Sequence, residues 1–324
     1  MLKLIDGGFV YNDRFGFGLS TLNTLRLFAA YLGVILLWAT TPLAIKWSAE
    51  GAGFIFGAAL RMSIGTLCVF LILAGSRKGL PLHKRAIKTY LAVALQIYGA
   101  MMAVYWSARF IPSGWVSVIF GLAPFMTAML SAIFLQEKSL SPTKILSYFL
   151  GIGGLAMMFS SAIELNEKAI QGMVGVLLGA FLHSLSAVCI KRIDGKLPAM
   201  TQVAGGLLIA MPLYLCSWFY LDQAQWPAVL PMRSLLAIVY LGIVATTLGF
   251  ALYYYVLTHL SATNVAMITI ISPVLALMLG HFVNGETLTI KVAVGTSMIL
   301  AALIAHQFIE RRQKIRLRHQ QEGA

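Results

Sequence analysis

Charged residues are scarce in this chain. Only 11% of its 324 residues are Asp, Glu, Lys or Arg, whereas 59% are hydrophobic. A soluble globular domain has roughly 25% charged residues, so this chain lacks the polar surface that a water-soluble fold needs. The shortage of charge therefore predicts an integral membrane protein.

Cysteine and mid-span acidic residues are also scarce. The three cysteines, Cys68, Cys189 and Cys216, lie within apolar segments and are far apart in the sequence, which argues against a metal site and against a set of disulfides. No Asp or Glu lies in the middle of an apolar segment, although proton-driven pumps commonly carry such a carboxylate. This absence favours facilitated export, or proton coupling through His183.

What the chain has instead is long apolar segments. A membrane-spanning helix needs about 20 predominantly apolar residues, and the loops between the segments are too short to fold as separate domains. The first segment is followed by others and lacks a cleavage pattern, so we interpret it as a span. We expect an all-α integral membrane protein with ten spans, at 27–47, 53–74, 86–108, 112–135, 143–161, 172–193, 200–221, 233–257, 261–283 and 288–309.

Basic residues are distributed unevenly between the two sides of this expected membrane protein. If the N-terminus is cytoplasmic, the cytoplasmic segments carry 18 of the 24 Lys and Arg residues, the external ones carry 5, and Arg61 lies within a span. Cytoplasmic loops are enriched in Lys and Arg, so we expect both termini in the cytoplasm and the protein in a bacterial inner membrane. The net charge of +13 then faces anionic lipids rather than nucleic acid.

The chain contains an internal repeat. The stretch APFMTAMLSAIFLQE (123–137) corresponds to SPVLALMLGHFVNGE (272–286) at an offset of 149 residues. An offset of 145 relates WATTPLAIK (38–46) to HSLSAVCIK (183–191). Five spans in each half give the halves opposite orientations, an inverted repeat that places a transporter's site between the halves near the bilayer midplane. We therefore divide the chain into a cytoplasmic tail (1–26), two five-helix repeats (27–161 and 172–309) and a basic cytoplasmic tail (310–324).

Prolines interrupt several spans, among them Pro42, Pro124 and Pro273. A proline within a helix removes one backbone donor and displaces the carbonyl four residues earlier. In hydrocarbon a freed carbonyl must meet protein, water or a ligand. Because Pro124 and Pro273 are related by the repeat, we interpret these prolines as hinges of a conformational change, with static kinks as the alternative.

Together these features resemble the drug/metabolite transporter superfamily, and most closely its EamA-type branch. The resemblance rests on ten spans in a five-plus-five repeat, WATTPLAIK in span one, Arg61 early in span two, and an Ala/Ser-Pro…Gly/Gln-Glu pattern in both halves. It covers roughly residues 27–309, but Ala187 stands where the first half has Pro42, and the N-terminal extension is long. The resemblance implies an exporter of small metabolites, such as amino acids and their relatives, that works by alternating access.

Candidate substrate-binding residues come from aromatic and polar side chains within the spans. A mid-span tyrosine needs a partner for its hydroxyl and tends to face a cavity or another helix, and a histidine there is a functional hypothesis by default. The offset of 149 also relates one face of span three to span eight. The expected set is Trp38, Thr41, Tyr98, Met101, Tyr105, His183, Thr247, Phe250 and Tyr254. Ordinary packing between helices is the alternative for each, including a structural role for His183.

Four charged residues lie at the ends of spans or, in the case of Arg61, a short way inside one. Arg61 is about two turns into span two, where an exposed charge is expensive, so it either snorkels outward or lines the outer vestibule and attracts carboxylates. Lys46 ends span one and resembles a vestibule lysine of the family, although snorkelling also explains it. Glu137 and Glu286 follow spans four and nine, and we expect them to cap a helix or pair at the interface.

Other functions fit the sequence less well. Ser113 precedes a glycine, as in an intramembrane serine protease with His183 as base, but Ile111 stands where that motif needs glycine. An ion channel would need charge rings or a filter sequence. A flippase for lipid-linked sugars or small lipids shares the fold and stays as an alternative. We expect no catalytic residue, metal or cofactor, and a homodimer is left open.

Overall fold

The computed structural model describes residues 17–75, 79–136, 142–165, 167–259 and 262–322. Within these ranges the side chains of 17–24, 142–144, 167, 250, 254, 257–258, 262–267, 310–311 and 313–322 are outside the description. The first half comprises α1 (Phe17–Ser48), α2 (Phe54–Gly75), α3 (Lys84–Ala94), the π-helix η1 (Leu95–Ala100), α4 (Met101–Ser107), α5 (Ser113–Phe120), α6 (Ala123–Phe134) and α7 (Pro142–Leu165). The second comprises α8 (Glu167–Ile193), α9 (Ala199–Leu221), α10 (Met232–Val239), the π-helix η2 (Tyr240–Leu248), α11 (Gly249–His259), α12 (Ala262–Asn284) and α13 (Ile290–Glu322).

The described helices form the expected membrane protein. Nine helical segments among the described residues are long and apolar enough to cross a membrane, and the apolar part of α12, Ile268–Asn284, is shorter. Three spans are composite, because α3–η1–α4, α5–α6 and α10–η2–α11 each follow one continuous path. These segments coincide with the ten spans expected from the sequence, which confirms the all-helical fold with two inverted five-helix repeats.

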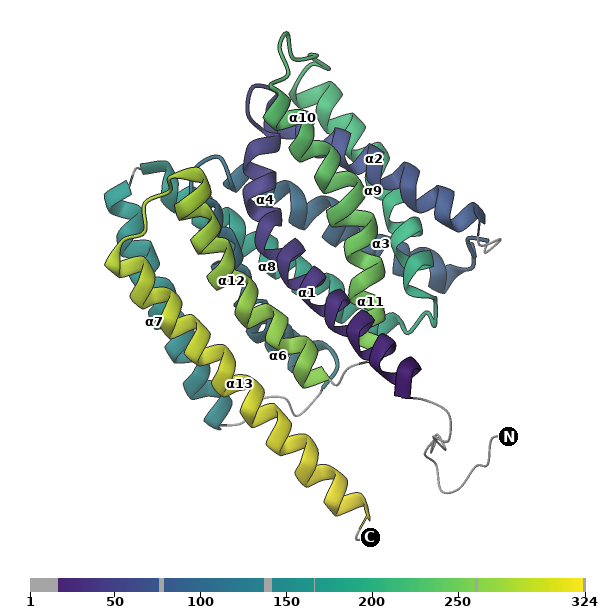
Figure 1. The fold of residues 1–324 in the computed structure, drawn as a ribbon, viewed down its shortest axis with the longest axis vertical. Helices are drawn as coiled ribbons and strands as arrows, with labels where there is room; N and C mark the ends of the chain where they lie inside the picture. The colour runs from purple at the N-terminus through teal and green to yellow at the C-terminus, as the bar shows by residue number, and fades with distance from the viewer. Residues whose placement is uncertain (1–16, 76–78, 137–141, 166, 260–261, 323–324) are drawn as a thin grey trace.

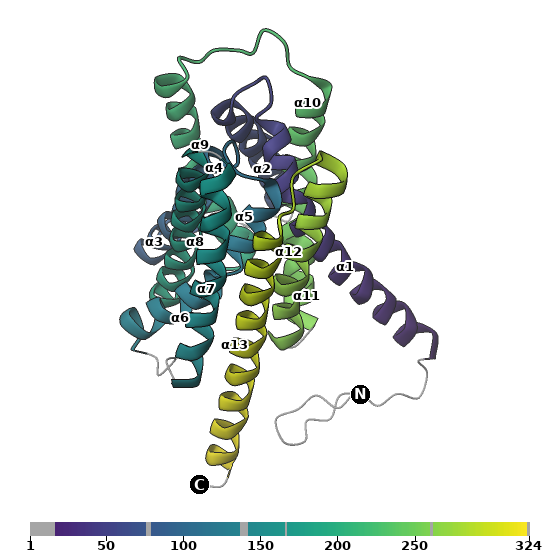
Figure 2. The ribbon, with the colours of Figure 1, turned by 90° about the vertical axis from the view of Figure 1, so that its left-hand side faces the viewer.

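The first and last helices extend beyond the expected first and last spans. α1 begins at Phe17 rather than at 27, and α13 continues to Glu322 through the basic segment after 309. Extending an existing helix costs little compared with starting one, so both spans propagate beyond their apolar parts. α1 begins and α13 ends at the same end of the molecule (Figure 1 and Figure 2). We call the opposite end the distal end.

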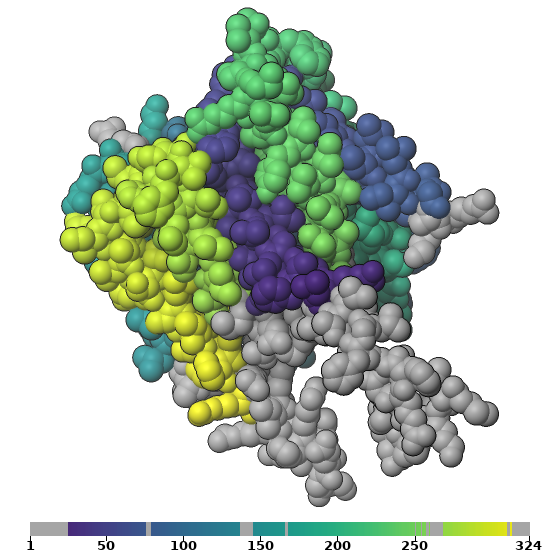
Figure 3. All heavy atoms as spheres, in the orientation of Figure 1, coloured from purple at the N-terminus to yellow at the C-terminus, as the bar shows by residue number. Residues whose placement is uncertain are grey.

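The two halves are interlocked rather than separate. α1 packs against α10, α11 and α12 of the second half, whereas α8 packs against α3, η1, α4 and α6 of the first half. Figure 3 shows α1 on the surface between α12 and the helices α10 and α11. We call α1, α10, η2, α11 and α12 the α1 group, and α8, α3, η1, α4, α5 and α6 the α8 group. The pairs α2–α9 and α7–α13 complete the fold.

The two groups approach each other most closely between α5 and α12. A Cβ atom added to Gly114 of α5 would lie 2.7 Å from the Cα atom of Leu277 in α12. A Cβ atom on Gly280 would lie 3.1 Å from the Ser113 hydroxyl oxygen. Glycine at 114 therefore lets the two backbones approach each other, and glycine at 280 leaves room for the side chains of Ser113 and Glu286 near the distal end.

Spans three and eight each contain a π-helical segment. The offset of 149 moves Leu95–Ala100 onto residues 244–249, which overlap η2. In η2 the hydroxyls of Thr246 and Thr247 donate to the carbonyls of Leu241 and Gly242, five residues earlier. π-helical turns are rare and frequently occur at functional sites. This repeat-related pair was not expected from the sequence.

The related prolines do not interrupt their spans in the same way. Span four is broken at Gly121 and Leu122, and Pro124 occupies the first turn of α6. A proline there sacrifices no helical hydrogen bond, because the first N–H groups of a helix have no partner within it. Pro273 instead lies inside the continuous α12, as Pro42 lies inside α1. The expectation that Pro124 displaces a carbonyl in mid-helix is therefore wrong.

Candidate functional site

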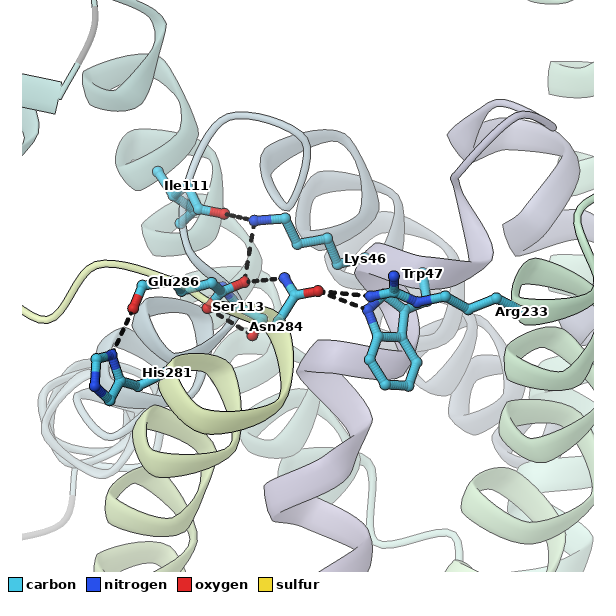
Figure 4. A network of polar contacts seen from close by, with 8 residues as sticks. All are labelled: Lys46, Trp47, Ile111, Ser113, Arg233, His281, Asn284 and Glu286. Carbon is cyan, nitrogen blue, oxygen red and sulfur yellow. Dashed lines mark hydrogen bonds and ion pairs between the residues drawn. The ribbon is translucent and has the colours of Figure 1, made fainter.

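A network of polar contacts at the distal end is centred on Glu286 (Figure 4). Its Oε1 atom accepts hydrogen bonds from Lys46 Nζ at 3.1 Å and from Asn284 Nδ2 at 2.9 Å. Its Oε2 atom accepts from the backbone N and the Oγ of Ser113, at 2.8 and 2.9 Å. The side chain is only 8% exposed, so these four donors replace its water. We call Lys46, Ser113, Asn284 and Glu286 the distal network.

Local backbone geometry brings this carboxylate to the start of α5. Gly285 follows α12 with φ of +63°, a conformation that glycine adopts without steric cost. The chain then turns back, and the Glu286 amide donates to the Gly280 carbonyl at 3.0 Å. A carboxylate at the first N–H groups of a helix is favoured by the helix dipole. Glu286, which follows α12, therefore caps α5. The sequence had predicted that Glu286 would cap a helix or form a pair, without indicating which helix.

The rim of the network adds contacts from α1 and α10. Asn284 Oδ1 accepts from Trp47 Nε1 at 2.9 Å and from Arg233 Nη2 at 2.6 Å. The Arg233 guanidinium lies 4.1 Å from the centre of the Trp47 ring and 3.7 Å from a carboxylate oxygen of Glu50. His281 contacts the Glu286 carbonyl oxygen through Nδ1 at 2.8 Å.

Lys46 and Glu286 connect the α1 group to the α8 group. Lys46 Nζ donates to the Ile111 carbonyl at 3.2 Å, just before α5, while Glu286 binds Ser113 within α5. The Lys46 side chain is 28% exposed, so one edge of the pair faces out of the protein. Snorkelling alone does not account for Lys46, because its ammonium has two protein acceptors.

The network keeps Glu286 ionised. Burial raises the pKa of its carboxyl, but the Ser113 amide, the Lys46 ammonium and the Asn284 amide outweigh burial and hold the pKa below its ordinary value. Hydrogen bonds and an opposite charge favour the charged form of an acid. The ion pair therefore persists at neutral pH and is lost only on acidification below the ordinary carboxyl range.

A second polar cluster surrounds Arg61 in α2. The residue is 6% exposed, which excludes an arginine that snorkels outward. Its Nε donates to the Thr246 hydroxyl in η2 and its Nη1 to the Tyr105 hydroxyl in α4, both at 3.4 Å. The guanidinium carbon lies 5.9 Å from the centre of the Tyr105 ring. The cluster thus joins α2 to both composite spans that contain a π-helix.

The predicted substrate residues of spans three and eight lie in several environments. Tyr98 shares a 2.6 Å hydrogen bond with Ser217 of α9, and its ring meets the edge of Tyr214 at 5.1 Å. Met101 packs against the core, and Thr247 donates within η2. The side chains of Phe250 and Tyr254 lie outside the described residues.

The predicted residues of spans one and six are also separated. Trp38 is 37% exposed and stacks on Tyr253 of α11 at 5.4 Å, and Thr41 donates to the Leu37 carbonyl of its own helix at 2.5 Å. His183 presents its ring to the edge of Phe120 at 5.9 Å. These residues contact different neighbours, so the structure does not gather the whole predicted set around one point.

Comparison with known proteins identifies the fold as that of a transporter family. The model of the EamA-like transporter family matches residues 26–160 and 170–305. The chain belongs to this family. It is therefore a multi-pass membrane protein of a transporter family, with a small-molecule substrate and a lipid environment. In line with this, Ser113, the conceivable protease nucleophile, directs its hydroxyl at Glu286.

Individual relatives are distant. The chain is 24% identical over 296 residues to the uncharacterized transporter YoaV of Bacillus subtilis, covering 90% of this chain and 100% of that protein. It is 26% identical over 219 residues to a probable amino-acid metabolite efflux pump of Salmonella typhimurium, covering 65% and 73%. It is 23% identical over 267 residues to the uncharacterized inner membrane transporter YedA of Escherichia coli, covering 82% and 85%.

A solved crystal structure shares the fold. It superposes with a TM-score of 0.61 at 20% sequence identity, covering 90% of this chain and 99% of the other. At this identity the match supports the arrangement of the helices and nothing about the substrate.

Proposed function

We propose that this EamA-like transporter exports small metabolites, amino acids or related compounds, across the bacterial inner membrane by alternating access. Both termini are then cytoplasmic and the distal end is external. The observation that carries the proposal is the distal network, which joins the α1 group to the α8 group at one end of the molecule. A contact of this kind closes one access route, and breaking it opens the route.

The chemistry of the network suits a reversible closure. Lys46 and Glu286 lie at the ends of spans, where water can hydrate both charges when their contacts with Ile111 and Ser113 of the other group break. Hydration offsets much of the lost attraction, so an ion pair near water contributes modestly to stability. The α5–α12 contact at Gly114 packs the backbone of α5 against the backbone and side chain of Leu277 and supplies the apolar part of the same closure.

The inverted repeat supports a matching closure at the cytoplasmic end. The offset of 145 relates Lys46 to Lys191, and the offset of 149 relates Glu286 to Glu137. Glu137 lies outside the described residues, so the second pair rests on the sequence repeat. Alternating access then consists of exchanging the contacts that one Lys–Glu pair makes across the two groups for those of the other pair.

We propose that the substrate path runs along the two π-helical segments. Tyr98 lies in η1, Met101 and Tyr105 follow it in α4, and Thr247 lies in η2. Backbone of this kind has carbonyls away from regular helical partners, and hydroxyls close by can bind a polar solute. The relative named as a probable amino-acid metabolite efflux pump supports amino acids and their relatives as the substrate class and export as the direction.

Transport in liposomes tests the proposal. Purified full-length protein is reconstituted, and uptake of a panel of labelled amino acids, amines and hydroxy acids is measured with and without a pH gradient, with protein-free liposomes as control. We expect saturable, protein-dependent movement of at least one compound. Acceleration by the gradient would assign proton coupling and direct attention to His183. If no compound in the panel moves faster than in protein-free liposomes, the proposal fails.

A further inference from the structure

Arg61 is a buried cation that lacks an acidic partner in the described part of the chain. Its side chain is 6% exposed, and the ion pairs recorded there join Lys46 to Glu286, Arg233 to Glu50, and Lys291 to Glu164. An uncompensated buried charge is costly, and such charges within spans are retained for functional reasons. The cluster therefore has a place for an anion.

The guanidinium also has donors to spare. It carries five N–H groups, of which the described residues accept two, at the Thr246 and Tyr105 hydroxyls. Both contacts are 3.4 Å long, whereas hydrogen bonds from charged nitrogen are commonly about 2.7–2.9 Å. The protein thus holds the Arg61 side chain in position but leaves part of its hydrogen-bonding capacity unused.

Arg61 lies where a solute that passes between the two groups of helices would meet it. It lies seven residues after the start of α2 at Phe54, about 10 Å along the helix axis from its distal end. Its two partners come from different groups, Tyr105 from the α8 group and Thr246 from the α1 group. When the groups separate at the distal end, the guanidinium lies along the opening between them.

The second half has no counterpart of this arginine. The offset of 145 places Gly206 of α9 at the related position, so the cluster contains one cation rather than a symmetric pair. A single planar guanidinium matches the two oxygens of a carboxylate, and its one positive charge balances the one negative charge of a monocarboxylate.

We propose that Arg61, positioned by Tyr105 and Thr246, recognises the carboxylate of the transported metabolite. This inference rests on the proposed transport function and narrows its substrate class to monocarboxylates such as free amino acids. The spare N–H groups form a bidentate pair with the substrate carboxylate. The two hydroxyls hold the fork in place while the site is empty.

Competition between matched compounds tests the inference. Each free amino acid in the panel is paired with its methyl ester and its decarboxylated amine, and each compound competes with a labelled transported substrate in proteoliposomes. Thermal stabilisation of the detergent-purified protein by the same compounds measures binding without transport. We expect the acid to compete at least tenfold better than its methyl ester, as suits a charge-assisted hydrogen bond. Arg61→Gln should reduce the preference to less than about threefold.

Three further variants distinguish recognition from folding. Arg61→Lys keeps the charge but loses the planar fork, and should weaken the preference while the protein still reaches the membrane; it replaces Arg61→Gln if that variant does not fold. Tyr105→Phe removes one positioning hydroxyl and should weaken the preference for the acid less than Arg61→Lys does. Arg109→Gln, which removes an arginine stacked on Phe54, should keep the wild-type preference.

The outcomes separate this inference from the proposed function. Equal competition by acids and methyl esters in the wild-type protein overturns the role of Arg61 and leaves transport intact. A preference that survives in the Arg61 variants overturns it as well. If no compound is transported or stabilises the protein, the proposed function fails and the inference with it.

Discussion

At the scale of single residues, the function depends on charges that have well-defined partners. Glu286 has four hydrogen-bond donors around one carboxylate, and Arg61 has two long contacts around one guanidinium. The first arrangement closes a contact between two groups of helices. The second leaves a cation available to a ligand.

Removing the charge of Glu286 should open the distal end. Glu286→Gln keeps the shape of the side chain but weakens the charge-assisted hydrogen bonds from Ser113, which join the α1 group to the α8 group. A loss of about 1.4 kcal/mol changes the ratio of closed to open states about tenfold. We expect Ala108→Cys, buried beside α4, to react about tenfold faster with an external hydrophilic thiol reagent, after the three native cysteines are replaced. Glu164→Gln, which breaks the pair with Lys291, should leave the reaction rate unchanged.

The same assay should show a defined pH dependence. Because the pKa of Glu286 is held below its ordinary value of 4.5, the network is fully formed above that value and is lost as pH falls through the lowered pKa. Reactivity of the Ala108→Cys thiol, corrected for thiol ionisation, should be flat from about pH 5 to about pH 8. A rise in corrected reactivity between about pH 7 and about pH 6 would assign closure to a histidine instead.

Close contact at Gly114 should limit the size of the side chain there. A Cβ atom at this position meets the Cα atom of Leu277 at 2.7 Å, and backbone cannot move aside as a flexible side chain can. We expect Gly114→Ala to destabilise the protein by about 1–3 kcal/mol, measured as a lower unfolding temperature in detergent. At Gly249 the nearest atoms lie 3.6 Å from an added Cβ, so Gly249→Ala should be tolerated; equal loss in both variants would contradict the account.

At the scale of elements, broken or altered hydrogen bonding occurs in spans of both groups. Span four breaks between α5 and α6, and spans three and eight change from α- to π-helical. Such segments have fewer regular bonds to lose and can bend at lower cost. We propose these segments, with Pro42 and Pro273, as the hinges of the transport cycle.

The two repeat-related prolines should behave differently on substitution. Pro273→Ala restores a hydrogen bond within α12, which should straighten the helix, stabilise the fold and slow transport. Pro124→Ala changes the first turn of α6, where proline is well tolerated, and should leave the transport rate within about twofold of wild type. Transport rates and membrane levels of both variants test this contrast. Equal slowing in both would restore the symmetric interpretation.

The sequence predicted those elements that depend on composition and on internal repetition. Span positions follow from the length of apolar segments, and the inverted repeat follows from the offset of 149. The pairing of Glu286 was expected in kind, but its partner Lys46 is 240 residues away and is chosen by tertiary packing. Neither Leu95–Ala100 nor Tyr240–Leu248 has a composition that distinguishes a π-helix from an α-helix, because the two differ by one residue in hydrogen-bond spacing.

At the scale of the whole molecule, the interlocked halves define two groups of helices. Each half contributes its first helix to the group formed mainly by the other half. Movement of one group against the other therefore changes contacts on both sides of the membrane. The α7–α13 pair lies outside both groups and serves as a fixed support in this account.

The orientation of the molecule follows from its basic residues. Because the cytoplasmic segments would carry 18 of 24 Lys and Arg residues, we expect both termini inside. A C-terminal reporter enzyme that is active only in the cytoplasm should be active in the fusion. Activity of a periplasm-dependent reporter at the same position would invert the assignment of the distal end.

Cross-linking of the distal network tests the central claim most directly. In a protein without native cysteines, Ser113→Cys in α5 of the α8 group and Glu286→Cys, which follows α12 of the α1 group, are joined by a short, reducible bifunctional thiol reagent. Transport in liposomes is measured before and after reduction. A matched pair, Glu164→Cys and Lys291→Cys, joins α7 to α13, which lie outside both groups, and should tolerate the same cross-link. If the two groups separate in each cycle, the first cross-link stops transport and reduction restores it. Transport that continues at the full rate with the Ser113 and Glu286 positions joined would contradict alternating access through the distal end.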